Sequence, residues 1–197
     1  MELISTLFST GWASGVNAYG TVALLSILGR AGVGPIPDGL ESDPILLGAL
    51  VMFAIEFVVD KIPILDSAWD TVHTVIRPLI GSWLGFEFGT AAEISQLEEG
   101  VAAGGSGLTA LLSHGVKAGL RLGINASPEP ASNWIASFTE DGLVATVTFF
   151  ALENPELAAV IAAVLLVIGL GAVITLWTKL IRPAMIRFMN RGRAADP

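Results

Sequence analysis

The chain of 197 residues contains no cysteine, a single tyrosine and few charged side chains. The absence of cysteine excludes disulfide bridges, thiolate metal sites and a cysteine nucleophile. Charged residues make up 14% of the sequence and hydrophobic residues 53%, whereas an ordinary soluble domain has roughly 25% charged residues. The net charge of −8, with no basic patch, argues against nucleic acid as a partner. With a mean hydropathy of +0.71, this composition predicts an integral membrane protein.

Several catalytic signatures are also missing from the sequence. It has no HExxH zinc motif, no GxSxG nucleophile with partner acids and no phosphate-binding P-loop. No cofactor is therefore predicted. The first residues lack the basic start and short apolar run of a cleavable signal, so we expect a retained membrane segment there.

Apolar stretches separated by proline, glycine or clustered acids predict about six transmembrane helices. The basic residues of the tail, together with Lys61, Lys117 and Arg121, then fall on one side, and most acids fall on the other. The positive-inside rule places that basic side, and both termini, in the cytoplasm. The predicted fold class is an all-α, polytopic helical membrane protein with N-in/C-in topology. A five-span or re-entrant variant stays open because the fifth candidate is short. The candidate spans are residues 5–29, 44–60, 67–86, 99–117, 136–152 and 155–179.

The sequence also contains an internal repeat. Residues 20–32 and 107–119 are identical at seven of thirteen positions, and VIRP at 75–78 recurs as LIRP at 180–183. An odd number of spans in each repeat gives the two halves opposite orientations, which predicts a 3+3 inverted repeat. Chance similarity among Gly-, Ala- and Leu-rich helices is the alternative. The predicted single membrane domain comprises a first repeat at 1–87, a second at 88–190 and a cytoplasmic tail at 191–197.

A polar stripe lies in the middle of the first half. Four polar residues between positions 66 and 77 are spaced i, i+4, i+7 and i+11, which is one face of a helix. Two further acids, four residues apart, precede them. Ionisable groups at membrane depth are costly and mark functional sites, so the stripe predicts a membrane-embedded polar site. The alternative is a capped helix, headgroup charges and one buried ion pair. The candidate residues are Glu56, Asp60, Asp66, Asp70, His73 and Arg77.

A second polar cluster, NASPEPASNWIASFTED, covers residues 125–141. Its Pro-x-Pro predicts a rigid turn before a helix. Three of its polar residues are spaced i, i+4 and i+11, and the predicted topology brings them in from the same side as the first stripe. Two such tracks could line one vestibule, and an ordinary loop with a solvated first turn is the alternative. The candidates are Glu129, Asn133, Glu140 and Asp141.

Small residues at four-residue spacing begin each half: Gly11 and Gly15, then Gly100 and Gly104. This spacing lets helices approach closely and suggests a possible homo-oligomer through Gly-rich faces. Dense glycines would also permit a broken helix with exposed backbone dipoles. Close packing alone is the favoured interpretation, and Asn17, within the first Gly-rich segment, is a candidate site residue.

Three stretches resemble a known family. They are GVNAY near the N-terminus, EFVVDKIPILDSAWDTVHTVIRP in the middle and NASPEPASNWIASFTED later in the chain. The sequence from about residue 11 to 182 is similar to small bacterial multi-pass membrane proteins catalogued as domain of unknown function 4126. The resemblance implies several helical spans and a location in the bacterial cytoplasmic (inner) membrane. It implies no activity and no catalytic residue.

Carboxylates outnumber basic groups in the two polar tracks, which favours a cationic ligand. We therefore expect an integral membrane transporter, cation- or proton-coupled, with a site near the bilayer midplane. His73 would be the proton-linked group and Arg77 the internal counter-charge or gate. The expected ion ligands are Glu56, Asp70, Glu129 and Glu140.

Other functions stay open at this point. Arg77, His73 and Lys61 could instead hold a phosphate headgroup in a lipid flippase or scramblase. Asp66 and Asp70 could hold a divalent metal in an intramembrane lipid-phosphate enzyme. A non-catalytic assembly subunit is the fourth possibility. The predicted partners are membrane lipids and a small ion or small-molecule substrate.

Overall fold

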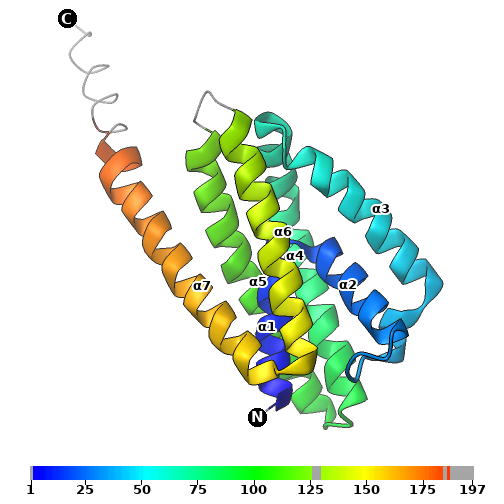
Figure 1. Cartoon of the computed structure of the whole chain (residues 1–197). Helices are drawn as coiled ribbons and strands as arrows, with labels where there is room; N and C mark the ends of the chain where they lie inside the picture. Colours follow the sequence, from blue (N-terminus) through cyan, green and yellow to red (C-terminus); the bar gives the residue numbers. More distant parts are fainter. Residues whose placement is uncertain (1, 126–129, 184–185, 187–197) are drawn as a thin grey trace, which may run out of the picture.

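The computed structural model describes residues 2–125, 130–183 and 186, and every regular element in that part of the chain is helical. The predicted all-α class is confirmed. In Figure 1 the long helices run side by side between two ends of a bundle. The helices are α1 (Glu2–Val16), α2 (Ala18–Arg30), α3 (Asp43–Val59), α4 (Pro63–Ala91), α5 (Gln96–Asn125), α6 (Pro130–Glu153) and α7 (Pro155–Leu176). Two short elements add to them, the 3-10 turn η1 (Asp38–Glu41) and the π-helical turn η2 (Trp177–Ile181).

Helix boundaries follow from local sequence. Prolines occupy the first turn of α3, α4 and α7, where a missing N–H removes no helical bond. Asn17 and Asn154 cap α2 and α7, each accepting a hydrogen bond from the backbone N–H three residues later. Before α5, the Ser95 N–H and hydroxyl bond to Glu98 and lower the pKa of its carboxyl. Pro78 lies inside α4 and removes one backbone hydrogen bond there.

The predicted first span, residues 5–29, is wrong as a single crossing because the helix breaks at Asn17. Helix α1 has 15 residues and a length of about 22 Å, roughly half that of α4, which has 29 residues. It begins where α6 meets α7, since the Thr6 hydroxyl lies 3.4 Å from the Ala151 carbonyl.

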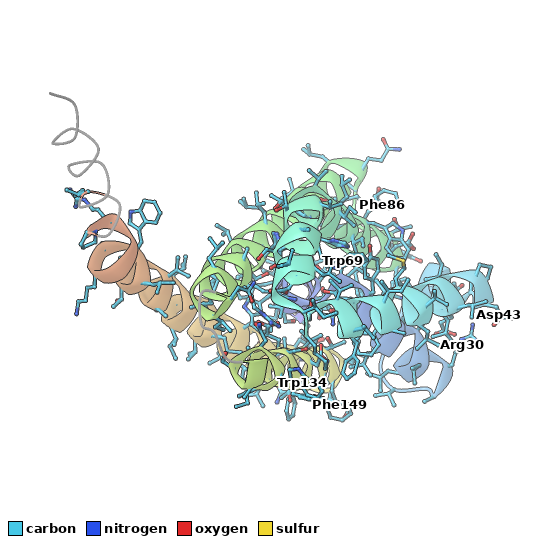
Figure 2. All side chains as sticks on the ribbon, turned by 90° about the horizontal axis from the view of Figure 1, so that it is seen from above. Arg30, Asp43, Trp69, Phe86, Trp134 and Phe149 are labelled. Carbon is cyan, nitrogen blue, oxygen red and sulfur yellow. The ribbon has the colours of Figure 1, made fainter. Side chains whose placement is uncertain are left out.

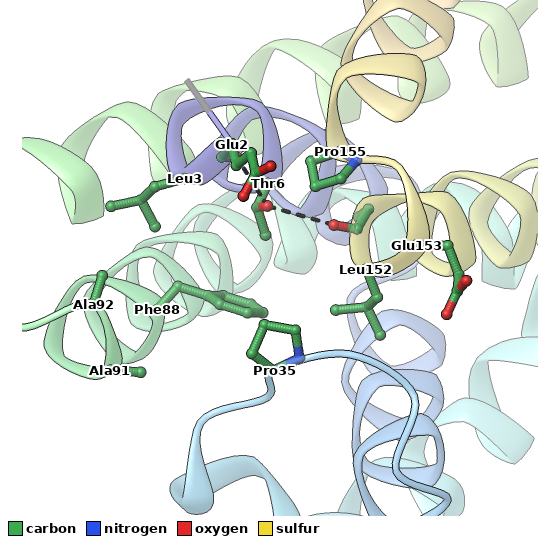
Figure 3. Close-up of a pocket in the computed structure, with 11 residues that line it drawn as sticks. Glu2, Leu3, Thr6, Pro35, Phe88, Ala91, Ala92, Leu152, Glu153 and Pro155 are labelled. Carbon is green, nitrogen blue, oxygen red and sulfur yellow. Dashed lines mark hydrogen bonds between the residues drawn. The ribbon is translucent and has the colours of Figure 1, made fainter.

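Helix α2 returns to the end of the bundle at which α1 begins. After α2, Gly34 adopts a positive φ of 72° and lies against Leu152. Figure 3 shows Pro35 beside Phe88 and Leu152, in the same pocket as Thr6. Helices α1 and α2 therefore form a helical hairpin that turns halfway along the bundle.

The two ends of the bundle differ in charge. In Figure 1, α1 begins at the lower end and α7 finishes at the upper end. The first described helix therefore begins at one end of the bundle and the last finishes at the other, whereas N-in/C-in topology requires both termini on the same side. The reason is the turn at Asn17. By the bounds of the helices, the lower end carries Glu2, Arg30, Glu41, Glu93, Glu98, Glu153 and Glu156, and we call it the acidic end. The upper end carries Lys61, Lys179 and Arg182, and we call it the basic end.

Charged and polar side chains lie inside the bundle beside two apolar clusters, and many other large apolar side chains are exposed on the outside. Figure 2 shows Phe86, Trp134 and Phe149 on the periphery, and 42–50% of each is exposed. Two of the described helices, Ala131–Glu153 and Pro155–Lys179, are long and apolar enough to cross a membrane. This exterior supports membrane association.

Of the four glycines with predicted four-residue spacing, the first pair packs closely and the second pair does not. A Cβ on Gly11 would lie 2.7 Å from the Ser106 carbonyl oxygen, and one on Gly15 would meet the Ala110 backbone. In contrast, Gly100 and Gly104 have no described heavy atom within 4 Å of that position. The first Gly-rich segment thus has both the close packing and the helix break, and contact between copies of the chain stays a prediction.

The predicted repeat also stays a prediction. Its two matched stretches lie on α2 and α5, which run in opposite directions in Figure 1, as an inverted repeat requires. The boundary at residue 87 falls inside α4, near its end.

Candidate functional site

The break between α1 and α2 lies beside a cluster of charged and amide side chains from α3, α4, α5 and α6. Most of these side chains are fully buried, and only Glu140 and Asp141 are partly exposed. We call this cluster the charge network. It consists of Glu56, Asp60, Asp66, Asp70, Arg77, His114, Lys117, Arg121, Asn133, Glu140 and Asp141.

Arg77 lies at the centre of the charge network and has no exposed surface. Its Nη2 donates to Glu56 Oε1 at 2.7 Å and lies 3.3 Å from Asp70 Oδ1. Its Nη1 donates to the Gly15 carbonyl at 3.1 Å and to His114 Nδ1 at 2.8 Å. A buried guanidinium is tolerated only when it is paired in this way.

Lys117 links three helices to α1. Its Nζ lies 3.0 Å from Asp60 Oδ2, 3.4 Å from Glu140 Oε2 and 3.6 Å from Glu56 Oε1. It also donates to the Val16 carbonyl at 3.1 Å. The ammonium therefore joins the acids of α3 and α6 to the end of α1.

Arg121 forms a two-bond pair with Glu140, through Nε to Oε1 at 3.0 Å and Nη2 to Oε2 at 2.7 Å. This planar geometry is the strongest arrangement between a guanidinium and a carboxylate. Its Nη1 donates to the Asp60 carbonyl at 3.1 Å and to Asn133 Oδ1 at 3.3 Å. Asp66, 3.9 Å from the same nitrogen, extends the network toward the basic end.

The ends of the broken helix are held by the charge network. The last carbonyls of a helix lack intrahelical partners and carry partial negative charge. The Gly15 carbonyl accepts a hydrogen bond from Arg77, and the Val16 carbonyl accepts one from Lys117. On the other side of the break, Asn17 Nδ2 donates to Asp141 Oδ1 at 2.9 Å. These partners satisfy the polar groups that a break in the bundle interior exposes.

The hydrogen bonds of His114 define its protonation. Because a guanidinium only donates, Nδ1 must accept from Arg77. Nε2 then carries the ring proton and lies 3.1 Å from both the Asp70 carbonyl and the Thr74 hydroxyl. His114 is thus a neutral bridge between α4 and α5.

His73 lies beside the charge network and faces a different set of residues. Nδ1 carries a proton, since it lies 2.8 Å from the Trp69 carbonyl, and Nε2 pairs with the Tyr19 hydroxyl at 2.9 Å. The imidazole also stacks on the Trp69 ring with centroids 4.4 Å apart. Its contacts are therefore aromatic, and the structure shows no ion pair between His73 and the described carboxylates.

Carboxylates exceed basic side chains in the charge network. Six carboxyl groups surround Arg77, Lys117 and Arg121. Lys61, near the rim, donates to the Phe57 carbonyl at 2.7 Å and to the Ser137 hydroxyl at 3.3 Å, and its ammonium lies over the Phe57 and Phe138 rings. Buried polar atoms in proteins nearly always have a partner. Six buried carboxylate oxygens accept no hydrogen bond from the described residues: Glu56 Oε2, Asp60 Oδ1, Asp66 Oδ1, both oxygens of Asp70, and Asp141 Oδ2.

Two cavities reach the charge network. A crevice of about 150 Å³ between α4 and α5 (the α4–α5 crevice) is lined by Ser67, Asp70, Thr71, Thr74, Ala118, Arg121 and Leu122. A cavity of about 210 Å³ bounded by α2, α3 and α6 (the α2–α6 cavity) is lined by Asn17, Gly20, Ala23, Leu24, Ile27, Leu50, Phe53, Asp141, Val144 and Ala145. Within the part of the chain that the structure describes, no group of three or more His, Cys, Asp or Glu residues is placed to hold a metal ion.

The structure brings most of the predicted site residues together. Those that meet at the charge network or bond to it are Asn17, Glu56, Asp60, Asp66, Asp70, Arg77, Asn133, Glu140 and Asp141. His73 lies beside it, and Glu129 falls outside the described residues. The sequence prediction missed the contribution of α5 and interpreted two of its basic residues as interfacial charges. His114, Lys117 and Arg121 are spaced i, i+3 and i+7, so the same helical-face rule could have found them.

Buried ion pairs, many exposed apolar side chains and two helices of membrane length describe an all-helical protein and support membrane association. Residues 4–175 match the family model described as Domain of unknown function (DUF4126), so the chain belongs to that family and the resemblance is confirmed. Comparison with curated proteins and with solved structures gives no match.

Proposed function

We propose that the protein is an integral membrane transporter in which the charge network binds and releases a proton or a small cation. The observation that carries the proposal is the excess of buried carboxylates at a helix break. Six carboxyl groups meet three basic side chains, and several of their oxygens have no hydrogen-bond partner among the described residues.

The carboxylates in excess of the buried basic side chains are costly to keep ionised. Burying one ionised carboxylate without a partner costs several kcal/mol. Protons or bound cations would remove that cost, and a group that gains and loses them readily is suited to transport. Glu56, Asp70, Glu140 and Asp141 would carry the exchangeable charge, and Arg77 would be the fixed counter-charge.

The broken helix supports the same function. Irregular backbone at membrane depth is tolerated where protein or a cavity shelters it, and transporters place such breaks at their binding sites near the midplane. Here α1 and α2 would form a re-entrant pair and α3–α7 would cross a bacterial cytoplasmic membrane. The basic end would lie in the cytoplasm, following the positive-inside rule.

The phosphate-headgroup alternative has less support. Arg77, Lys117 and Arg121 each pair with carboxylates, so an anionic headgroup would have to displace internal partners. The metal-dependent alternative would need a ligand cluster, and the described residues contain no such group.

The test uses purified protein in liposomes that enclose a dye sensitive to protons, sodium or potassium, with flux driven by an imposed potential. We expect the wild type to carry protons, sodium or potassium faster than protein-free liposomes. Glu56→Gln should lower that flux at least about tenfold, because it removes the carboxylate that pairs with Arg77. Asp43→Asn is the matched control, since Asp43 is 90% exposed at the acidic end.

Two results would overturn the proposal. One is wild-type flux equal to that of protein-free liposomes for every cation tested. The other is a Glu56→Gln variant that melts like the wild type and transports like Asp43→Asn.

A further inference from the structure

The two cavities at the charge network lie toward opposite ends of the bundle. The α4–α5 crevice begins at Ser67, about 6 Å from the start of α4, and extends to Thr74, about 11 Å further along. Its α5 wall includes Leu122, close to the end of that helix. Both helices have these termini at the basic end, so the lining residues of the crevice run from near the basic end toward the middle of the bundle.

The α2–α6 cavity extends the other way. It starts at Asn17, at the helix break, and follows α2 as far as Ile27, near the acidic end. Apart from Asn17 and Asp141, its lining residues are apolar. Apolar cavities in proteins stay dry, whereas polar ones hold water. The crevice, lined by hydroxyl groups, Asp70 and Arg121, is the polar one.

Asp70 is the carboxylate at which the crevice meets the charge network. It is 4% exposed, and neither of its oxygens accepts a hydrogen bond from the described residues. The groups that face it are Asp66, His73 and Arg77 on its own helix, His114 and Arg121 on α5, and Glu56 on α3 through Arg77.

We infer that the coupling ion is the proton, that Asp70 is its first acceptor, reached from the basic end through the α4–α5 crevice, and that the Asn17–Asp141 hydrogen bond closes the path to the acidic end. This inference rests on the proposed function and adds the ion, the direction of access and the closed side.

The surroundings of Asp70 select a proton over a metal ion. A sodium or potassium ion there would face Arg77, 3.3 Å from Asp70 Oδ1, and the guanidinium of Arg121 on the crevice wall. Hard cations also need several oxygen ligands. A proton needs only one carboxylate oxygen.

The transfer step is simple. A hydronium ion in the crevice gives its proton to one oxygen of Asp70, which leaves a water molecule and a neutral carboxyl group. Arg77 then has Glu56 as its remaining ionised partner, and its bonds to Gly15 and His114 hold it in place. A change in the pairing of Arg77 alters its hydrogen bond to the Gly15 carbonyl at the end of α1. The helix break transmits this change to α2, where Asn17 bonds to Asp141.

The natural absence of cysteine permits a direct test of access. Two matched single variants, Ala118→Cys in the crevice and Ala23→Cys in the α2–α6 cavity, are treated with a charged, membrane-impermeant thiol reagent in sealed vesicles of known orientation. Glu93→Cys marks the acidic end and Lys179→Cys the basic end. Ala118→Cys should react from the basic side only, and Ala23→Cys should react from neither side.

Adding Asn17→Ala should open the closed side. Ala23→Cys should then react from the acidic side at least about tenfold faster. Asp141→Ala removes the same hydrogen bond from α6 and should have the same effect if Asn17→Ala fails to fold. The inference would be overturned if Ala118→Cys reacted from the acidic side or did not react at all. It would also be overturned if Ala118→Cys and Ala23→Cys reacted at equal rates while Asn17 and Asp141 were unchanged.

The identity of the ion is tested in liposomes whose buffers contain only choline salts. We expect proton flux to persist without sodium or potassium and to fall at least about tenfold in Asp70→Asn. A flux that requires sodium or potassium would overturn the inference and leave the proposed function standing. No flux of any cation, with the labelling pattern as expected, would overturn the proposed function and leave only the direction of access.

Discussion

Replacing Gly15 with alanine should disturb both the packing of α1 and the charge network. Gly15 lies in the last turn of α1, where the helix crosses α5 closely. An added Cβ would meet the hydroxyl of Ser113 and the backbone of Ala110, whose carbonyl carbon would be 2.8 Å away. Because most of these atoms are backbone, the clash can be relieved only by moving one helix.

The cost has two parts. Overpacking in a well-packed interior costs about 1–3 kcal/mol. Moving α1 outward would also lengthen the hydrogen bonds from Arg77 and Lys117 to the last two carbonyls of α1, and bonds to charged groups are worth about 1.5–3 kcal/mol each. We expect a total loss of about 2–5 kcal/mol from these terms.

The assay is thermal or denaturant unfolding of the purified protein in detergent, compared with Gly104→Ala. Gly104 is also a helical glycine, but no described heavy atom lies within 4 Å of its Cβ position. Its replacement should be neutral or stabilise the protein by up to about 1 kcal/mol, because alanine favours helix. Equal stability of Gly15→Ala and Gly104→Ala would refute the close contact that fixes α1 to the network.

Two further predictions concern the network and the break. Arg77→Met should lower the free energy of unfolding by about 3–5 kcal/mol, because it leaves Glu56 buried without its main partner. Adding Glu56→Gln should recover part of that loss, with a coupling energy of about 1–3 kcal/mol in a double-mutant cycle, and purely additive effects would contradict the pairing. Asn17→Ala and Asn154→Ala should each cost about 1 kcal/mol through a lost helix cap. Only Asn17→Ala should also change transport in the liposome assay, because only Asn17 bonds to Asp141.

Several features of the candidate site were readable from residue spacing. The stripe from Asp66 to Arg77 and the acids of α6 follow the helical period, and each contains polar groups where an apolar face would be expected. That periodicity indicates which residues share a face, and the structure confirms that these faces turn inward. The stripe on α5 obeys the same rule, and it was missed because Lys117 and Arg121 lie near a predicted span end.

The sequence by itself determined the helical class, the positions of most helix ends and the presence of polar faces, because composition, caps and periodicity act within a few residues of one another. Only the tertiary structure decided that the first apolar segment turns back at Asn17. That turn is stable because Arg77, Lys117 and Asp141, distant in sequence, supply partners to the backbone and side chain at the break. The pairing of each carboxylate likewise depends on how four helices pack, and local sequence does not specify such distances.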